Sequence, residues 1–190
     1  MNGKVFPYMP TKIALVTGSL RKDANSKRLA KAFASLFPKE YQTFNPEIGH
    51  LPLYNQDYDN SPDEPESYAD FRKEIASADG VIFITPEYNR GLPAVMKNAI
   101  DIASRPWGKN AWNGKPAVVI SSSGGVMGGF GANHQLRQSL AFLNMRVLAQ
   151  PEAYIGKAQT LVDEDGKILS EDTQKFFQSI VDGFVELIQD

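Results

Sequence analysis

The stretch Ile13-Ala14-Leu15-Val16-Thr17-Gly18-Ser19-Leu20-Arg21 joins a short apolar run to a Gly-Ser turn, and a segment with helical spacing follows from Ser26. A buried strand that ends in such a turn and leads into a helix aims backbone N–H groups and the positive end of the helix dipole at one point. Arg21 adds a cation that can bind a phosphate through two hydrogen bonds. The stretch therefore favours a phosphate-binding turn, although an α/β protein without a ligand can contain the same junction.

Further apolar runs, separated by segments with helical spacing, extend this pattern along the chain. The predicted strands are 13–17, 41–44, 80–85, 116–121 and 146–149, and helical spacing occurs near 26–36, 68–78, 94–102, 136–143 and 176–188. Strands that alternate with helices form right-handed βαβ units and a parallel sheet covered on both faces. The sequence predicts a three-layer α/β/α sandwich of five parallel strands and about five helices.

Composition limits both the size and the partners of the protein. The 190 residues, 42% of them hydrophobic, predict a single domain (1–190) that begins with a short N-terminal leader (1–11). The net charge of −2 and the pI of about 5.7 give no field that would recruit nucleic acid or an anionic membrane. No apolar run reaches the length of a membrane span, and no targeting segment is recognised, so a cytoplasmic protein is expected.

The absence of cysteine and the presence of only two histidines exclude several classes of site. Disulfides, thiol nucleophiles and cysteine-ligated metals cannot occur, and no metal site is expected. Neither a Gly-x-Gly-x-x-Gly fingerprint nor a P-loop is present, so tightly held NAD or ATP is not indicated. A phospho-receiver domain would need an aspartate near the end of the third strand, where this chain has Thr85-Pro86.

Ligands of open parallel sheets bind outside the carboxyl ends of the strands, so residues that follow strands are the candidates. After the third predicted strand, Pro86 to Asn89 combine a rigid start, the flat ring of Tyr88 and an amide, which suits a planar heterocycle. The alternative is an ordinary surface turn. After the fourth, the glycine-rich stretch 123–131 is either a flexible loop or a place where a ligand lies against bare backbone.

Five motifs in a fixed order narrow the fold class further. They are Gly18-Ser19-Leu20-Arg21 with Ser26, Leu51-Pro52-Leu53-Tyr54-Asn55, Pro86-Glu87-Tyr88-Asn89, the segment 92–101, and Ser123-Gly124-Gly125. Together they resemble the NADPH-dependent FMN reductases, a flavodoxin-like group that includes quinone and chromate reductases, over about residues 12–156. This resemblance implies a flavodoxin-like sheet with strand order 2-1-3-4-5. The leader has no recognised counterpart in that family.

The resemblance also implies a cofactor and the residues that hold it. FMN would be bound with its phosphate against Ser19, Arg21 and Ser26. Its isoalloxazine ring would lie against the segment Pro86, Glu87, Tyr88 and Asn89, with further contacts from Ser123, Gly124 and Gly125. No catalytic side chain is needed, because the chemistry takes place at the flavin.

The implied activity is an NAD(P)H-dependent FMN reductase or quinone reductase with a ping-pong mechanism. NADPH or NADH is the transient hydride donor, and the acceptor is a quinone, azo dye, metal oxyanion or free flavin. A homodimer or homotetramer is implied as well. The alternatives are a flavodoxin-type electron carrier, which the cation at Arg21 and the modest acidity of the chain disfavour, and a flavin-binding sensor without turnover.

Several residues have open or structural interpretations. The Glu87 side chain is expected to be structural or to face solvent, and His134 to lie at a helix start or on the surface. Trp107 and Trp112 are expected to line either a substrate cleft or a subunit interface. The acidic segment 57–66 reads as a solvated loop, and the i, i+4 spacing of Lys97 and Asp101 as a surface ion pair.

Overall fold

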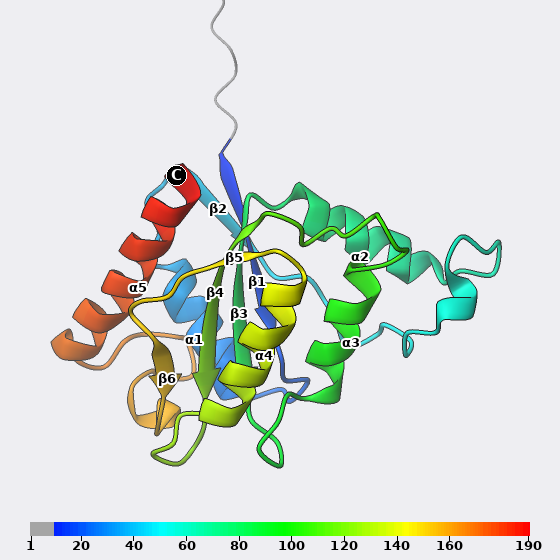
Figure 1. Cartoon of the computed structure of the whole chain (residues 1–190). Helices are drawn as coiled ribbons and strands as arrows, with labels where there is room; N and C mark the ends of the chain where they lie inside the picture. Colours follow the sequence, from blue (N-terminus) through cyan, green and yellow to red (C-terminus); the bar gives the residue numbers. More distant parts are fainter. Residues whose placement is uncertain (1–9) are drawn as a thin grey trace, which may run out of the picture.

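The computed structural model describes residues 10–190, which form one parallel sheet with helices on both faces (Figure 1). The strand order β2-β1-β3-β4-β5 confirms the predicted topology. The strands are β1 (Thr11–Thr17), β2 (Tyr41–Phe44), β3 (Gly80–Pro86), β4 (Pro116–Ser122), β5 (Arg146–Val147) and β6 (Ala153–Ile155). The predicted leader lies outside the described residues up to residue 9, and β1 already begins at Thr11.

The described residues contain five α-helices, as the sequence predicts, and two short 3₁₀ helices. They are α1 (Asn25–Ala34), α2 (Glu66–Ser77), α3 (Ala94–Ala103), α4 (Phe130–Phe142), α5 (Glu171–Gln189), η1 (Gln56–Tyr58) and η2 (Ala158–Thr160). Helices α1 and α5 cover one face of the sheet, and α2, α3 and α4 cover the other (Figure 1). None of the helices within residues 10–190 combines the length and the apolarity of a membrane span.

Alternation along the buried strands divides the core into two layers. In β1, Ile13 and Leu15 face α1 and α5, whereas Ala14 and Val16 face α2 and α3. On the first face, the ring of Phe33 in α1 stacks on that of Phe177 in α5 with centroids 4.6 Å apart. The side chains of both layers are almost completely removed from water, so the sheet is a rigid support for the loops at its ends.

The predicted strand at 146–149 is wrong in extent, because the chain leaves the sheet and returns. Only Arg146 and Val147 form β5, beside the start of β4. Strand β6 then pairs with the end of β4, placing Ile155 beside Ser122. Pro151, which lies between the two strands, has no N–H to donate to a sheet ladder. Strand β6 is not predicted from the sequence.

Candidate functional site

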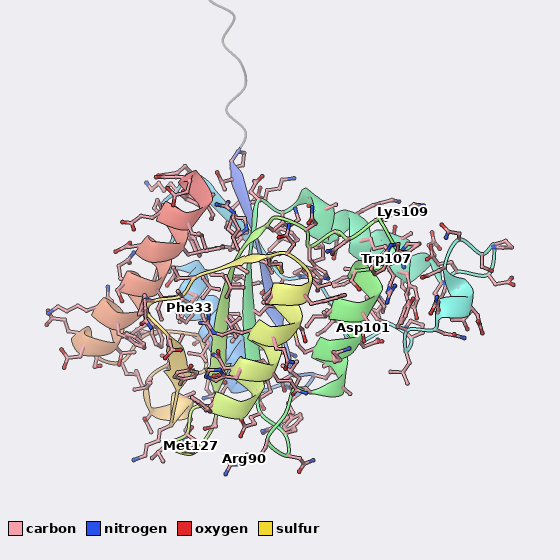
Figure 2. The ribbon with its side chains drawn as sticks, viewed as in Figure 1. Phe33, Arg90, Asp101, Trp107, Lys109 and Met127 are labelled. Carbon is pink, nitrogen blue, oxygen red and sulfur yellow. The ribbon has the colours of Figure 1, made fainter. Side chains whose placement is uncertain are left out.

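The carboxyl ends of β1, β3 and β4 meet at one edge of the sheet. The N–H of Gly18 donates to the carbonyl of Ile84 at 2.8 Å, and Pro86 pairs in register with Ser122. A Cβ on Gly18 would lie 3.0 Å from Thr85 Oγ1, so the close approach of the chain after β1 to the end of β3 leaves almost no space for a side chain at residue 18. The three strand ends singled out from the sequence are therefore brought together. Arg90, in the loop after β3, and Met127, in the loop after β4, both lie at this end of the molecule (Figure 2).

The N-terminus of α1 is left open toward this edge. Its N-cap residue, Ala24, makes no side-chain cap, and no acidic residue stands in the first turn. Ser26 is only 1% exposed, and its hydroxyl has no hydrogen-bond partner within residues 10–190. Ser19 Oγ accepts a hydrogen bond from the Arg21 N–H at 3.4 Å, and the Arg21 side chain is exposed. An uncapped helix end, a buried hydroxyl without a partner in the described residues and an exposed cation together fit a phosphate group.

The segment after β3 forms a tight two-residue turn. Tyr88 and Gly91 exchange backbone hydrogen bonds of 3.0 and 2.9 Å, and Asn89 and Arg90 between them have φ of +50° and +64°. Positive φ at both central residues is typical of the turns that close β-hairpins, and asparagine tolerates it better than most residues. The turn leaves Tyr88 50% exposed at the edge of the sheet, where its ring is available as an aromatic wall.

The carboxylate of Glu87 is bound inside the protein. Its Oε2 accepts the N–H of Ala132 at 3.0 Å, and its Oε1 lies 3.3 Å from Nη1 of Arg90. Ala132 is in the first turn of α4, whose own N-cap residue, Gly129, provides no side-chain cap. Glu87 therefore caps α4 from a different loop, which confirms the expected structural role of this side chain.

The glycine-rich stretch divides into two parts with different reasons for glycine. Gly124 and Gly125 are exposed, and a Cβ on either would meet no atom within 4 Å, so this part is open to a ligand. Gly128 and Gly129 have positive φ, and a Cβ on Gly128 would come within 2.5 Å of the Tyr154 backbone. Ser123 Oγ donates to the Gly125 carbonyl at 2.9 Å and helps to shape the open part.

Two further residues of the site were missed. The hydroxyl of Ser122 is buried at the end of β4 without a partner among the described residues. Gln135 in α4 accepts the N–H of Leu92 through its Oε1 at 2.7 Å. The serine run 121–123 was a signal for the first, whereas nothing in the local sequence distinguishes Gln135 from other exposed helix residues.

The remaining candidates lie apart from the three strand ends. Trp112 is completely buried, and its Nε1 donates to the Ile100 carbonyl at 3.1 Å, so the expectation of a cleft or interface is wrong for this residue. Trp107 is 77% exposed and lies far from Arg90 and Met127 (Figure 2). The predicted ion pair between Lys97 and Asp101 is confirmed at 2.7 Å.

His134 is an exposed residue in the first turns of α4, as expected. Its Nε2 lies 3.0 Å from the hydroxyl of Tyr154, which also donates to Glu152 at 2.8 Å. Burial, reinforced by the hydrogen bond to Glu152, raises the pKa of the Tyr154 phenol. These contacts are made within the protein, so they provide a structural role for His134.

The acidic segment 57–66 is only in part a solvated loop. Glu64 binds Arg72 of α2, and Asp59 Oδ2 accepts a hydrogen bond from the Tyr54 hydroxyl at 2.9 Å. Arg72 Nε also donates to the Ile102 carbonyl at 2.9 Å. These contacts attach the segment to α2 and α3, away from the edge formed by the three strand ends.

A cavity of about 630 Å³ adjoins the turn at Ser19 and Leu20. It lies between α1 and residues 45–50, and Ser19 and Leu20 belong to its lining. The segments after β3 and β4 do not contribute to it. The cavity therefore does not coincide with the place where the three strand ends meet.

Comparison with known proteins gives matches over almost the whole chain. A family model described as NADPH-dependent FMN reductase matches residues 11–160. A quinone reductase of Pseudomonas putida is 48% identical over 177 residues, 93% of this chain and 94% of that protein. A 2-hydroxy-1,4-benzoquinone reductase of a Burkholderia species is 46% identical over 182 residues, 96% of this chain and 98% of that protein.

A solved structure also matches almost the whole chain. FerB, a flavoenzyme NAD(P)H:(acceptor) oxidoreductase from Paracoccus denitrificans, superposes with a TM-score of 0.88 at 41% identity, covering 94% of this chain and 97% of that chain. The family match begins at β1 and ends in η2, so it includes all three strand ends of the candidate site.

Proposed function

Because this chain belongs to the NADPH-dependent FMN reductase family and is an FMN-dependent NAD(P)H oxidoreductase, we propose that it reduces quinones. The observation that carries the proposal is the similarity over nearly the full length to two enzymes named for quinone substrates. The acceptor is accordingly a small molecule. Azo dyes, metal oxyanions and free flavin are the alternative electron acceptors, and the experiment below compares them with a quinone.

We assign the FMN phosphate to the open N-terminus of α1. Ser26 supplies a buried hydroxyl without a partner in the described chain, Arg21 supplies a cation, and Ser19 holds the turn between them. A charge-assisted hydrogen bond contributes about 1.5–3 kcal/mol, so such contacts account for firm retention of a dianionic phosphate. The absence of acidic residues from the first turn of α1 removes the repulsion that a phosphate would otherwise meet.

We assign the isoalloxazine ring to the space between the segment 86–89 and the open part of the glycine-rich stretch. Pro86, Tyr88 and Asn89 form one side, with the Glu87 backbone, and Ser123, Gly124 and Gly125 form the other. The register of Pro86 with Ser122 supports this placement, because it puts the starts of both segments on neighbouring strands. The exposed backbone at Gly124 and Gly125 leaves room for a flat ring to approach.

Bound FMN supplies a ring that takes a hydride from NAD(P)H and passes two electrons to an acceptor. The protein binds and orients that ring, and none of its side chains needs to act as a general acid or base. The half-exposed Tyr88 borders an open face that the nicotinamide and then the quinone occupy in turn. This alternation is a ping-pong mechanism.

An anaerobic titration tests the proposal. FMN is added to the purified protein, NADPH or NADH is added next, and a benzoquinone is added last, while the flavin absorbance is followed. Bleaching by the nicotinamide and recovery with one equivalent of quinone support the assignment. Recovery only with a metal oxyanion, azo dye or free flavin would reassign the acceptor, and binding without bleaching would mean that the chain is a carrier or sensor.

We further propose that the enzyme acts in the cytoplasm, where NAD(P)H is available, as a homodimer or homotetramer. A groove of about 590 Å³ between α3 and α4 supports self-association, because Phe142 on its rim is 77% exposed. Exposed aromatic residues of this kind are common in protein interfaces. Light scattering of the wild type and of Phe142→Glu tests this, and a monomeric wild type would exclude it.

A further inference from the structure

The turn after β3 is attached to α4 by side chains from both partners. Glu87 at the start of the turn accepts the Ala132 N–H at 3.0 Å, and Gln135 of α4 accepts the Leu92 N–H at 2.7 Å at the end of the turn. The two hydrogen bonds therefore hold the turn at both of its ends. Helix α4 is also the element into which the glycine-rich stretch leads.

The absence of a side chain at residue 131 makes this attachment possible. A Cβ on Gly131 would lie 2.8 Å from the Arg90 carbonyl oxygen and 2.9 Å from Glu87 Oε2. Both distances are shorter than van der Waals contact, and the first involves backbone, which cannot rotate away. The turn and the first residues of α4 are consequently packed as closely as their backbones allow.

Within residues 10–190, few hydrogen bonds inside the turn itself hold its shape. Its own pair of hydrogen bonds joins only Tyr88 and Gly91, and an isolated two-stranded hairpin is marginally stable at best in water. Arg90 also occupies a left-handed conformation that is unfavourable for a long side chain. Its ion pair with Glu87 contributes little, because the Arg90 side chain is 74% exposed. The contacts to α4 therefore restrain where Tyr88 and Asn89 lie, in addition to the end of β3 and to Leu92, which packs against the core.

We propose that Glu87 and Gln135 are positioning residues, which fix the distance between the Tyr88–Asn89 turn and the glycine-rich stretch and thereby the width of the cleft for the FMN ring. The inference rests on the proposed placement of that ring between the two segments. Neither side chain acts on the flavin directly. Each acts by binding the turn after β3, which is one wall of the cleft, to α4. Helix α4 directly follows the glycine-rich stretch, which is the other wall.

Three variants of the full-length protein test the proposal through the dissociation constant of FMN, measured by quenching of flavin fluorescence. Glu87→Ala removes the acceptor for Ala132 and is expected to weaken FMN binding about tenfold. Glu87→Gln retains a carbonyl oxygen for the same N–H and is expected to restore most of the affinity. Gln135→Met keeps the length of the side chain but loses the acceptor for Leu92, with an expected loss of about threefold to tenfold.

The matched control is Glu171→Ala. Glu171 is likewise an acidic residue at the start of a helix, pairs with Lys175 at 2.7 Å, and lies in α5, which contributes nothing to the proposed cleft. Its removal is expected to leave the FMN dissociation constant unchanged. A comparable loss in this control would mean that general destabilisation, rather than positioning, weakens flavin binding.

Two further readouts separate positioning from a merely structural role. In a double-mutant cycle, Glu87→Ala and Gln135→Met are expected to be non-additive, because both release the same turn. At saturating FMN, both variants are expected to show an altered visible spectrum of the bound flavin and a higher KM for quinone. Unchanged FMN affinity, spectrum and KM, with only a lower melting temperature, would overturn the proposal.

Failure of the proposed function would look different. If the wild type does not bind FMN, the placement of the ring fails before any variant is compared. If Glu87→Ala does not fold, Gln135→Met decides the question, because it removes only the contact to Leu92. Wild-type behaviour of Gln135→Met in all three readouts would then exclude the attachment as a determinant of the cleft.

Discussion

The N-termini of α1 and α5 pack against the same face of the sheet but are completed in opposite ways. In α5, the Ser170 hydroxyl accepts the Thr173 N–H at 3.2 Å, and Glu171 and Asp172 place negative charge in the first turn. In α1, the N-cap residue is Ala24, the first turn has no acid, and the Ser26 hydroxyl has no partner in residues 10–190. Residues of its own segment therefore cap α5, whereas the N-terminus of α1 is left uncapped, as the proposed phosphate site requires.

Leaving α1 in this state has a cost in the absence of a ligand. The first N–H groups of a helix need acceptors, and a buried hydroxyl without a partner costs about 1–3 kcal/mol. A bound phosphate would remove both deficits and would also interact favourably with the helix dipole. Binding of FMN is therefore expected to raise the melting temperature of the protein.

The largest effect is expected when α1 is given a negative charge like that of α5. In Ser26→Asp, the new carboxylate occupies the place assigned to the phosphate, and repulsion between like charges should weaken FMN binding by more than about a hundredfold. In the apoprotein, the favourable interaction of the carboxylate with the helix N-terminus is opposed by its burial, because residue 26 is only 1% exposed, so the stability of the apoprotein is measured separately. Isothermal titration and urea unfolding measure the two effects. Retained FMN affinity would show that the phosphate lies elsewhere.

Arg21→Ala tests the cation beside the same helix end. Loss of one charge-assisted contact should weaken FMN binding by about tenfold to more than a hundredfold, with little change in the stability of the apoprotein, because the side chain is exposed. The loss should shrink at high salt, since screening weakens the contact in the wild type. Lys22→Ala, which removes the neighbouring exposed cation, serves as the control. An equal effect of both substitutions would point to general attraction rather than to a specific contact.

The contrast between the two helix ends also indicates which features of the molecule can be predicted from its sequence. The strand 13–17 and the turn at Gly18 were predictable, because apolar runs, β-branched residues and Gly-Ser are local signals. The order of strands and the meeting of their ends at one edge then follow from the rules of parallel sheets. Candidate binding residues that belong to a local motif can consequently be proposed from the sequence.

Features created by contacts between distant segments were not predictable. Trp112 stands in a polar, glycine-flanked stretch, and only the folded chain places its ring against Phe71 and Phe83. The capping of α4 by Glu87 joins residues 45 positions apart, and no periodicity encodes it. Strand β6 has three residues and depends on the open edge of β4 for its existence. Each of these lacks a local pattern because its partner is remote.

Ser170→Ala tests the capped N-terminus of α5. Removing the cap of α5 should lower the free energy of unfolding by about 1 kcal/mol, the usual cost of losing a serine N-cap. The FMN dissociation constant should not change, because α5 is completed without a ligand and lies outside the proposed cleft. Urea unfolding and flavin titration of the same preparation measure both quantities. Weaker FMN binding in this variant would mean that the two helix ends are coupled through the face of the sheet that they share.

No effect on FMN binding is expected for another polar contact that is satisfied within the protein, the hydrogen bond from Tyr54 to Asp59. Burial, together with this hydrogen bond and the charge of Asp59, raises the pKa of Tyr54 to about 12. The unfolded chain releases the same proton near pH 10, so the free energy of unfolding should fall as the pH rises from about 10 to about 12.

Tyr54→Phe removes this contribution and should make the alkaline decline shallower, although the variant is slightly less stable at neutral pH. The decline that remains comes in part from Tyr68 and Tyr154, whose pKa values are also raised by burial. Urea unfolding at several pH values between 9 and 12 measures the difference between the variant and the wild type. Because this contact is complete without FMN, the same difference should appear with and without the flavin, and a flavin-dependent difference would tie Tyr54 to the site.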